Sequence, residues 1–173
     1  MNKYFLILMG VFLIGGCSQN NNLAQPETLK ADKIIFGAIY GMCDGDCRNL
    51  YLINNKGLYK DADDKSNEYG NWQSTSFNNE NISKAEFENA ENLLNIPSNI
   101  LEKEKSASIE VQMLADFDYY LYIEKDGKSR ELIFDHIHKN ASPEIKSYFK
   151  TFLKSYEELG NSTIDTTRVE NYY

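Results

Sequence analysis

Two cysteines and two histidines are the residues whose types and spacing could carry chemistry in this chain. Cys43 and Cys47 enclose the segment Asp-Gly-Asp, and His136 and His138, the only histidines, stand two positions apart. Residues i and i+2 of a strand lie on one face, so both imidazoles could reach the same metal ion. Together with the two thiols they would supply four ligands of the kinds that zinc binds. A cysteine beside a histidine could also serve nucleophilic catalysis.

A simpler structural interpretation competes with each of these. The spacing of Cys43 and Cys47 is not the C-x-x-C of thioredoxin-like enzymes, and H-x-H is not the usual spacing of structural zinc ligands. Gly45 would let the chain reverse so that the two sulfurs meet, and the chain-entropy model gives so short a loop about 2 kcal/mol. We therefore expect a structural disulfide. Two free thiols, or a redox or metal role, are the alternatives, and we expect no metal.

Other catalytic and ligand-binding motifs are missing from the sequence. There is no G-x-S-x-G, no H-E-x-x-H and no glycine-rich phosphate loop. An EF-hand counted from Asp61 fails, because its sixth and twelfth positions are Ser66 and Trp72. The net charge of −8 disfavours nucleic acid, which needs a basic surface. We therefore expect no cofactor and no nucleic-acid partner, and we favour a binding protein over an enzyme.

The N-terminal segment has the pattern of a secretory signal peptide. Lys3 gives a positive start, and the apolar run from Tyr4 to Ile14 is too short for a comfortable transmembrane helix. The residues Ile14-Gly15-Gly16-Cys17 resemble the lipobox of bacterial lipoproteins. That resemblance implies a diacylglyceryl group on the sulfur of Cys17, cleavage before Cys17 and, in many bacteria, acylation of the new amino group. Two or three acyl chains hold a protein firmly on a membrane, whereas one holds it marginally.

A second resemblance concerns the strand, C-x-G-x-C corner and hairpin from Phe36 to Tyr59. This pattern is similar to a segment of uncharacterised bacterial lipoproteins of the Bacteroidota type, although Arg48 stands where many of them have Pro. The strand, Asp-Gly-Lys turn, strand, Pro and helix from Tyr119 to Leu159 extend the similarity. The resemblance implies no known activity. By analogy with enterobacterial lipoproteins, Ser18 favours the outer membrane over the inner membrane.

Hairpins dominate the secondary structure that we predict. Strand-forming runs occur at 34–40, 48–53, 58–59 and 109–123. The last run alternates with period two and predicts one long strand, or two joined at a bulge near Asp116. Asp126-Gly127 then makes a hairpin turn, which would place Leu121 opposite Leu132. We read residues 61–80 as a polar loop.

Two amphipathic helices complete the predicted fold. Ser83 and Glu86 form a capping box for a helix that stops before Pro97. Ser142-Pro143 opens a second helix, whose apolar stripe runs on to Gly160. Strands and helices do not alternate regularly, so we predict an α+β fold: an antiparallel sheet of hairpins with both helices packed on one face. We expect the second helix to cover Tyr120 and Tyr122.

The expected organisation comprises a signal peptide at 1–16, a lipidated flexible tether at 17–32, a single α+β domain at 33–160 and a C-terminal tail or edge strand at 161–173. The expected function is that of a membrane-anchored cell-envelope lipoprotein, acting as a non-catalytic binding or assembly module. Its partners would be the lipid membrane, through acylated Cys17, and an envelope protein that the sequence does not identify. The alternative is an envelope redox or metal-binding protein or enzyme that uses Cys43, Cys47, His136 and His138.

Overall fold

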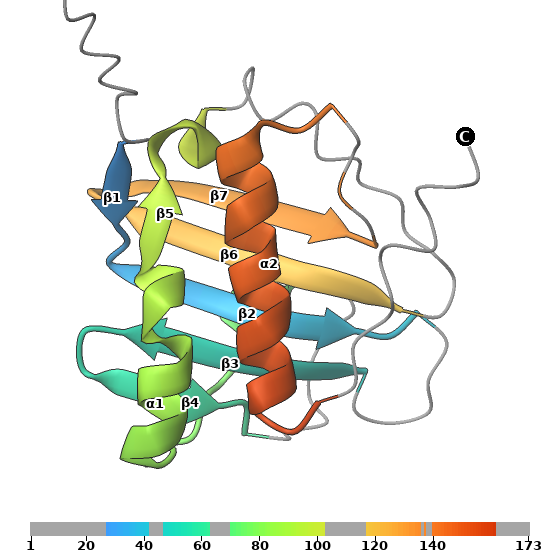
Figure 1. Cartoon of the computed structure of the whole chain (residues 1–173). Helices are drawn as coiled ribbons and strands as arrows, with labels where there is room; N and C mark the ends of the chain where they lie inside the picture. The colour runs from blue at the N-terminus through green and yellow to red at the C-terminus, as the bar shows by residue number, and fades with distance from the viewer. Residues whose placement is uncertain are drawn as a thin grey trace, which may run out of the picture.

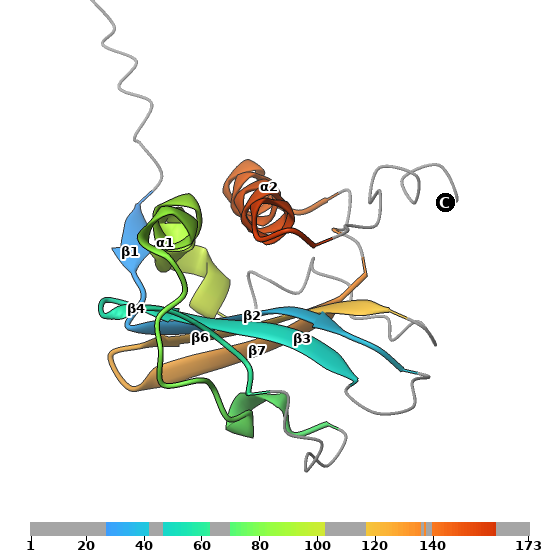
Figure 2. The ribbon, with the colours of Figure 1, turned by 90° about the horizontal axis from the view of Figure 1, so that it is seen from below.

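The computed structural model describes residues 27–41, 47–62, 70–102, 117–135, 137 and 140–161. A five-stranded antiparallel sheet with the strand order β4-β3-β2-β6-β7 forms the centre of this part of the chain. Both helices, α1 and α2, lie on the same face of the sheet (Figure 1, Figure 2). The predicted α+β fold is thus confirmed.

The strands of the main sheet follow the predicted runs closely. They are β2 (Lys33–Ile39), β3 (Arg48–Asn54), β4 (Gly57–Lys60), β6 (Asp118–Lys125) and β7 (Lys128–Phe134). Asp126 and Gly127 both have positive φ, as a type I′ hairpin turn requires. Leu121 lies opposite Leu132, which confirms the predicted register. Residues 103–116, which include the first half of the predicted long strand, lie outside the described residues.

Helix α2 (Pro143–Glu158) covers the middle of the sheet. Its N-cap Ser142 accepts a hydrogen bond from the backbone N–H of Ile145, and Pro143 occupies the first turn, as predicted. The ring of Phe152 lies 5.5 Å from the rings of both Tyr119 and Phe134, so aromatic side chains make up much of this interface. The apolar stripe of the sequence therefore corresponds to the buried face of the helix.

The first predicted helix ends earlier than its apolar pattern indicated. Helix α1 (Lys84–Ala90) begins with the predicted capping box of Ser83 and Glu86. The chain then tightens into the 3₁₀-helix η2 (Glu91–Leu94), extends as β5 (Asn95–Pro97) and turns again as η3 (Ser98–Leu101). Pro97 cannot donate a helical hydrogen bond, which is why the chain is already extended when it reaches this residue.

Part of the segment that we expected to be a flexible tether forms a strand. Strand β1 (Thr28–Lys30) lies within the expected tether, yet it pairs antiparallel with β5 in a small second sheet. Ala31 is buried, and the carboxylate of Asp32 accepts a 2.7 Å hydrogen bond from the backbone N–H of Asp126. A three-residue strand with one apolar side chain is too short for periodicity to reveal. Its partner strand supplies the hydrogen bonds that order it.

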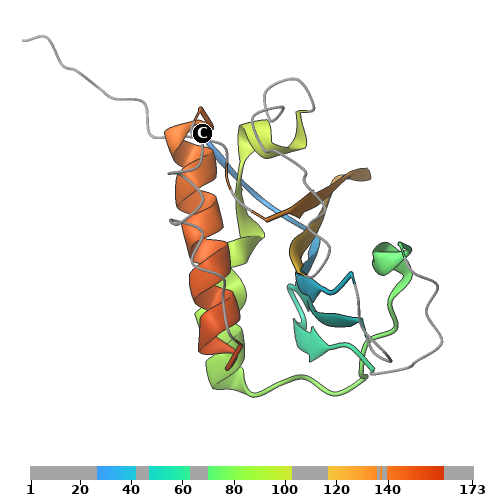
Figure 3. The same cartoon turned by 90° about the vertical axis from the view of Figure 1, so that its right-hand side faces the viewer.

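The sheet face opposite the helices is covered by the segment that the sequence presented as a polar loop. Part of this segment is the 3₁₀-helix η1 (Trp72–Ser74), which Figure 3 shows on the far side of the sheet from α2. Trp72 is buried against Ile35, Leu50 and Tyr120. Tyr120 is therefore covered by the segment around Trp72 and not, as we expected, by the second helix.

Candidate functional site

Most of the residues with predicted chemistry lie outside the described residues. Cys17, Cys43, His136 and His138 are among them, so the lipidation and the four-ligand cluster stay predictions. Cys47 is described: it directly precedes β3, is partly exposed and is disulfide-bonded. A bridged sulfur is not a thiolate ligand, which weakens the zinc interpretation. The pairing with Cys43 in particular stays a prediction.

Among the described residues, no group of three or more histidine, cysteine or acidic side chains could hold a metal ion. The buried charges here have another arrangement. Arg48 and Asp61 are both almost fully buried, with Nε and Oδ2 4.0 Å apart. The same carboxylate oxygen accepts a 2.8 Å hydrogen bond from the backbone N–H of Leu50. Because Asp61 begins the segment that carries Trp72, this pair fastens the covering segment to the sheet.

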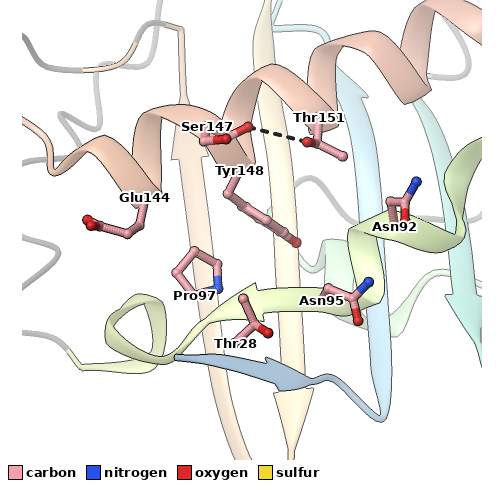
Figure 4. A pocket seen from close by; sticks show the side chains of 8 residues that line it. All are labelled: Thr28, Asn92, Asn95, Pro97, Glu144, Ser147, Tyr148 and Thr151. Carbon is pink, nitrogen blue, oxygen red and sulfur yellow. Dashed lines mark hydrogen bonds between the residues drawn. The ribbon is translucent and has the colours of Figure 1, made fainter. Parts of the chain in front are cut away.

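A groove between α2 and the β1–β5 pair is the candidate binding site. It has a volume of about 320 Å³, within the range of small-molecule sites. One wall is α2 and the other is formed by η2, β5 and β1 (Figure 4). Its lining residues are Thr28, Asn92, Asn95, Pro97, Glu144, Ser147, Tyr148 and Thr151.

Local structure explains how each wall presents polar groups. On α2, Glu144, Ser147 and Thr151 are three and four positions apart, so they share one face of the helix beside the buried stripe. On β5, Asn95 and Pro97 flank Ile96, which points into the core. Strand alternation therefore turns Asn95 and Pro97 toward the groove. Each element buries its apolar side in the core, and its polar side therefore faces the groove.

The groove offers mainly uncharged hydrogen-bonding groups. Thr151 donates from Oγ1 to the backbone carbonyl of Ser147 at 3.3 Å, as Figure 4 shows. Asn92 and Asn95 present amides that can both donate and accept. The hydroxyl of Tyr148 donates to the carbonyl of Leu93 at 3.0 Å and is thus already engaged below the groove.

One carboxylate gives the groove its charge. A hydrogen bond from the Ser142 hydroxyl, and then one from its own backbone N–H, lower the pKa of Glu144 below its ordinary value. Glu144 is therefore ionised at neutral pH and already occupies the positive end of the α2 dipole. The site consequently disfavours an anionic ligand.

Sequence reasoning did not identify the groove. Its residues come from three separate stretches of the chain, and asparagine, serine and threonine are ordinary surface residues when taken singly. Only the pairing of β1 with β5, and the packing of both beside α2, brings these stretches together. No signal in the sequence could have indicated this juxtaposition.

No protein-family model matches the chain, and no curated protein and no solved structure matches it. The similarity to Bacteroidota-type lipoproteins thus stays an expectation from the sequence. Within the described ranges, the helices are too short or too polar to cross a bilayer.

Proposed function

We propose that this protein is a lipid-anchored, non-catalytic binding protein of the bacterial cell envelope, with the groove beside α2 as its ligand contact. The observation that carries the proposal is the position of β1, which lines the groove and follows the lipobox-like Cys17 closely in sequence. Residues 18–27 can span at most about 35 Å when fully extended. An acylated Cys17 would therefore keep the groove within that distance of the bilayer.

The groove chemistry supports a neutral ligand rich in hydroxyl or amide groups. Asn92, Asn95, Ser147 and Thr151 can exchange hydrogen bonds with such groups, while ionised Glu144 repels anions. A serine nucleophile needs a neighbouring base. The lining contains no histidine or lysine, and the lowered pKa of Glu144 makes its carboxylate a weak base. Binding without chemistry is the use that these side chains support.

The anchor is tested by Cys17→Ala in the native host. We expect the variant to move from the membrane fraction to the soluble fraction, because it has no sulfur to acylate. Ser18→Ala is the matched control and should stay with the membranes. Intact-mass analysis of the native protein should show the loss of residues 1–16 and a gain of acyl mass. A Cys17→Ala variant that still pellets with membranes contradicts the proposed anchoring.

The groove is tested by placing a photo-crosslinking amino acid at Asn95 or Ser147 in the anchored protein. We expect discrete adducts from both positions, and none from Glu88, which is exposed on α1 away from the groove. Ser147→Arg should suppress the adduct formed from Asn95, because a long side chain would fill the space. Adducts that form equally well from Glu88, or that persist in Ser147→Arg, would rule out the groove as the binding surface.

A further inference from the structure

The outer edge of β7 carries backbone groups that pair with no other described segment. The two residues that flank a two-residue hairpin turn form a hydrogen-bonded pair, here Lys125 and Lys128. Every second residue of β7 counted from Lys128 therefore bonds to β6. The intervening residues direct their N–H and C=O groups outward, and these are Ser129, Glu131 and Ile133. Strand β7 ends the sheet order, and no described strand lies beyond it (Figure 1).

The opposite edge of the sheet is protected. Beside β4, the backbone N–H of Asn78 donates to the carbonyl of Lys60 at 2.9 Å, and that of Ile82 donates to Leu58 at 2.8 Å. The chain thus covers one edge with its own backbone, whereas no described residue does this for the other. Open edges are templates on which an extended segment can add as a further strand.

Side chains on the helix-facing side of β7 give this edge a charge preference. Nη1 of Arg130 is buried and has no hydrogen-bond partner among the described residues. Its cross-strand neighbour is the apolar Ile123, and burial lowers the pKa of the Arg130 guanidinium. Lys128 lies on the same side and is exposed. An added strand that brings a carboxylate would supply the acceptor that Arg130 lacks.

Glu131, the acidic residue of this strand, does not repel an acidic partner directly. It points to the other side of the sheet, where its carboxylate accepts a 2.8 Å hydrogen bond from the hydroxyl of Tyr120. The net charge of −8 repels acidic partners only at longer range, because exposed charges are screened beyond about 8 Å at physiological ionic strength. The positive charges of Arg130 and Lys128 therefore decide which partner charge this edge prefers.

We propose that the β7 edge captures an extended acidic segment of a partner protein, which adds to the sheet as a sixth strand and places a carboxylate against Arg130. In an antiparallel addition, the partner residues on the helix-facing side would stand opposite Leu132, Arg130 and Lys128 in turn. The recognised pattern then reads apolar-x-acidic-x-acidic. A second copy of this chain fits less well, because its own β7 edge offers Lys128 and Arg130 again on that side.

The test uses the purified full chain in detergent and a short fluorescein-labelled peptide with the pattern Val-x-Glu-x-Glu, followed by fluorescence anisotropy. The same peptide with glutamine in place of both glutamates is the control ligand. We expect the glutamate peptide to bind and the glutamine peptide to bind at least about tenfold more weakly, as expected for loss of charge-assisted hydrogen bonds. Binding of neither peptide, or of both equally, overturns the proposal.

Two variants locate the binding. Ser129→Pro removes an outward N–H and is tolerated by an edge strand, so it should abolish binding while circular dichroism shows an intact fold. Arg130→Gln should weaken binding about tenfold, whereas Lys84→Gln, which removes an exposed cation of α1, should not. Binding that survives Ser129→Pro overturns the proposal. Sedimentation that shows a dimer of the natural sequence and a monomer of Ser129→Pro would also overturn it, because the chain would then pair with itself through this edge.

This edge shares no residue with the groove, and the peptide assay requires no lipid anchor. Failure of peptide binding would leave the fractionation and crosslinking tests of the proposed function standing. Failure of those tests would equally leave this inference standing.

Discussion

The two faces of the five-stranded sheet are covered in different ways. Beneath α2, aromatic rings meet one another, and Phe152 lies within 6.4 Å of five of them: Phe36, Tyr119, Phe134, Phe149 and Tyr156. On the other face, an irregular segment buries the ring of Trp72, packs Phe77 beside it, and is fastened by the buried pair of Arg48 and Asp61 and by backbone hydrogen bonds. One face is held by distributed packing and the other by a few specific contacts.

This difference implies that substitutions on the two faces should affect unfolding in different ways. Apolar packing is shared among many contacts, so its loss is felt by the whole cooperative unit. A segment held by a few rings, one ion pair and a few backbone hydrogen bonds can open by itself, at a free energy below that of global unfolding. The chain contains a single tryptophan, and it lies on the second face. Its fluorescence therefore reports on the second face, whereas circular dichroism reports on the whole fold.

The largest effect is expected from Phe152→Ala. Removing a fully buried ring from the centre of the aromatic interface should lower the free energy of unfolding by about 4 kcal/mol. Urea unfolding followed by circular dichroism and by Trp72 fluorescence should shift together, because the helix face is part of the global unit. Leu153→Ala, which truncates a half-buried neighbour on the same helix, should cost about 1 kcal/mol. If the two variants lost the same unfolding free energy, the aromatic interface would not be the main source of stability on this face.

A smaller and more local effect is expected from Asp61→Asn. The change removes the negative charge of a buried ion pair while keeping the size of the side chain, and it should cost about 3 kcal/mol. Here the Trp72 transition should come at a lower urea concentration than the circular dichroism transition, because the covering segment detaches first. Coincident transitions in this variant would show that the second face is not separable, and the proposed contrast would fail.

The smallest effect compares the two faces by alkaline titration. Burial raises the pKa of Tyr120 on the second face, and of Tyr148 and Tyr156 on the helix face, above the ordinary value of 10.0. Above that pH the unfolded chain loses these protons and the folded chain keeps them, so stability must fall as the pH rises. Each such tyrosine contributes about 1.4 kcal/mol per pH unit.

Above pH 10.0 the free energy of unfolding falls as the pH rises. Tyr120→Phe and Tyr148→Phe should each reduce the steepness of that fall by the contribution of one proton. The measurement is the free energy of urea unfolding at several pH values above 10.0, with tyrosinate absorbance as the check on ionisation. If Tyr120 ionises in the folded protein before circular dichroism changes, the second face opens independently. A slope unchanged in both variants would mean that neither hydroxyl is held neutral by the fold.

Elements defined by neighbouring residues could be read from the sequence. The Ser83 capping box, the helix opened by Ser142 and Pro143, and the register set by Asp126-Gly127 are each fixed by residues a few positions apart. The apolar stripe of α2 also indicated its buried side correctly. The lipobox pattern is of the same local kind, and the lipid anchor that it predicts rests on sequence alone.

Contacts between distant segments could not be read in this way. Nothing near Thr28 indicates that it lies beside Pro97, and the polar surroundings of Trp72 concealed that this ring covers the sheet. The groove and the open edge of β7 arise from the order in which strands and helices are assembled. Periodicity and capping depend on the nearest turn of chain, whereas a groove, a covered face or an exposed edge depends on which remote segments return to the same place. The sequence by itself determined the longer elements and the predicted membrane address, and only tertiary packing decided the short strand β1 and the surfaces available for binding.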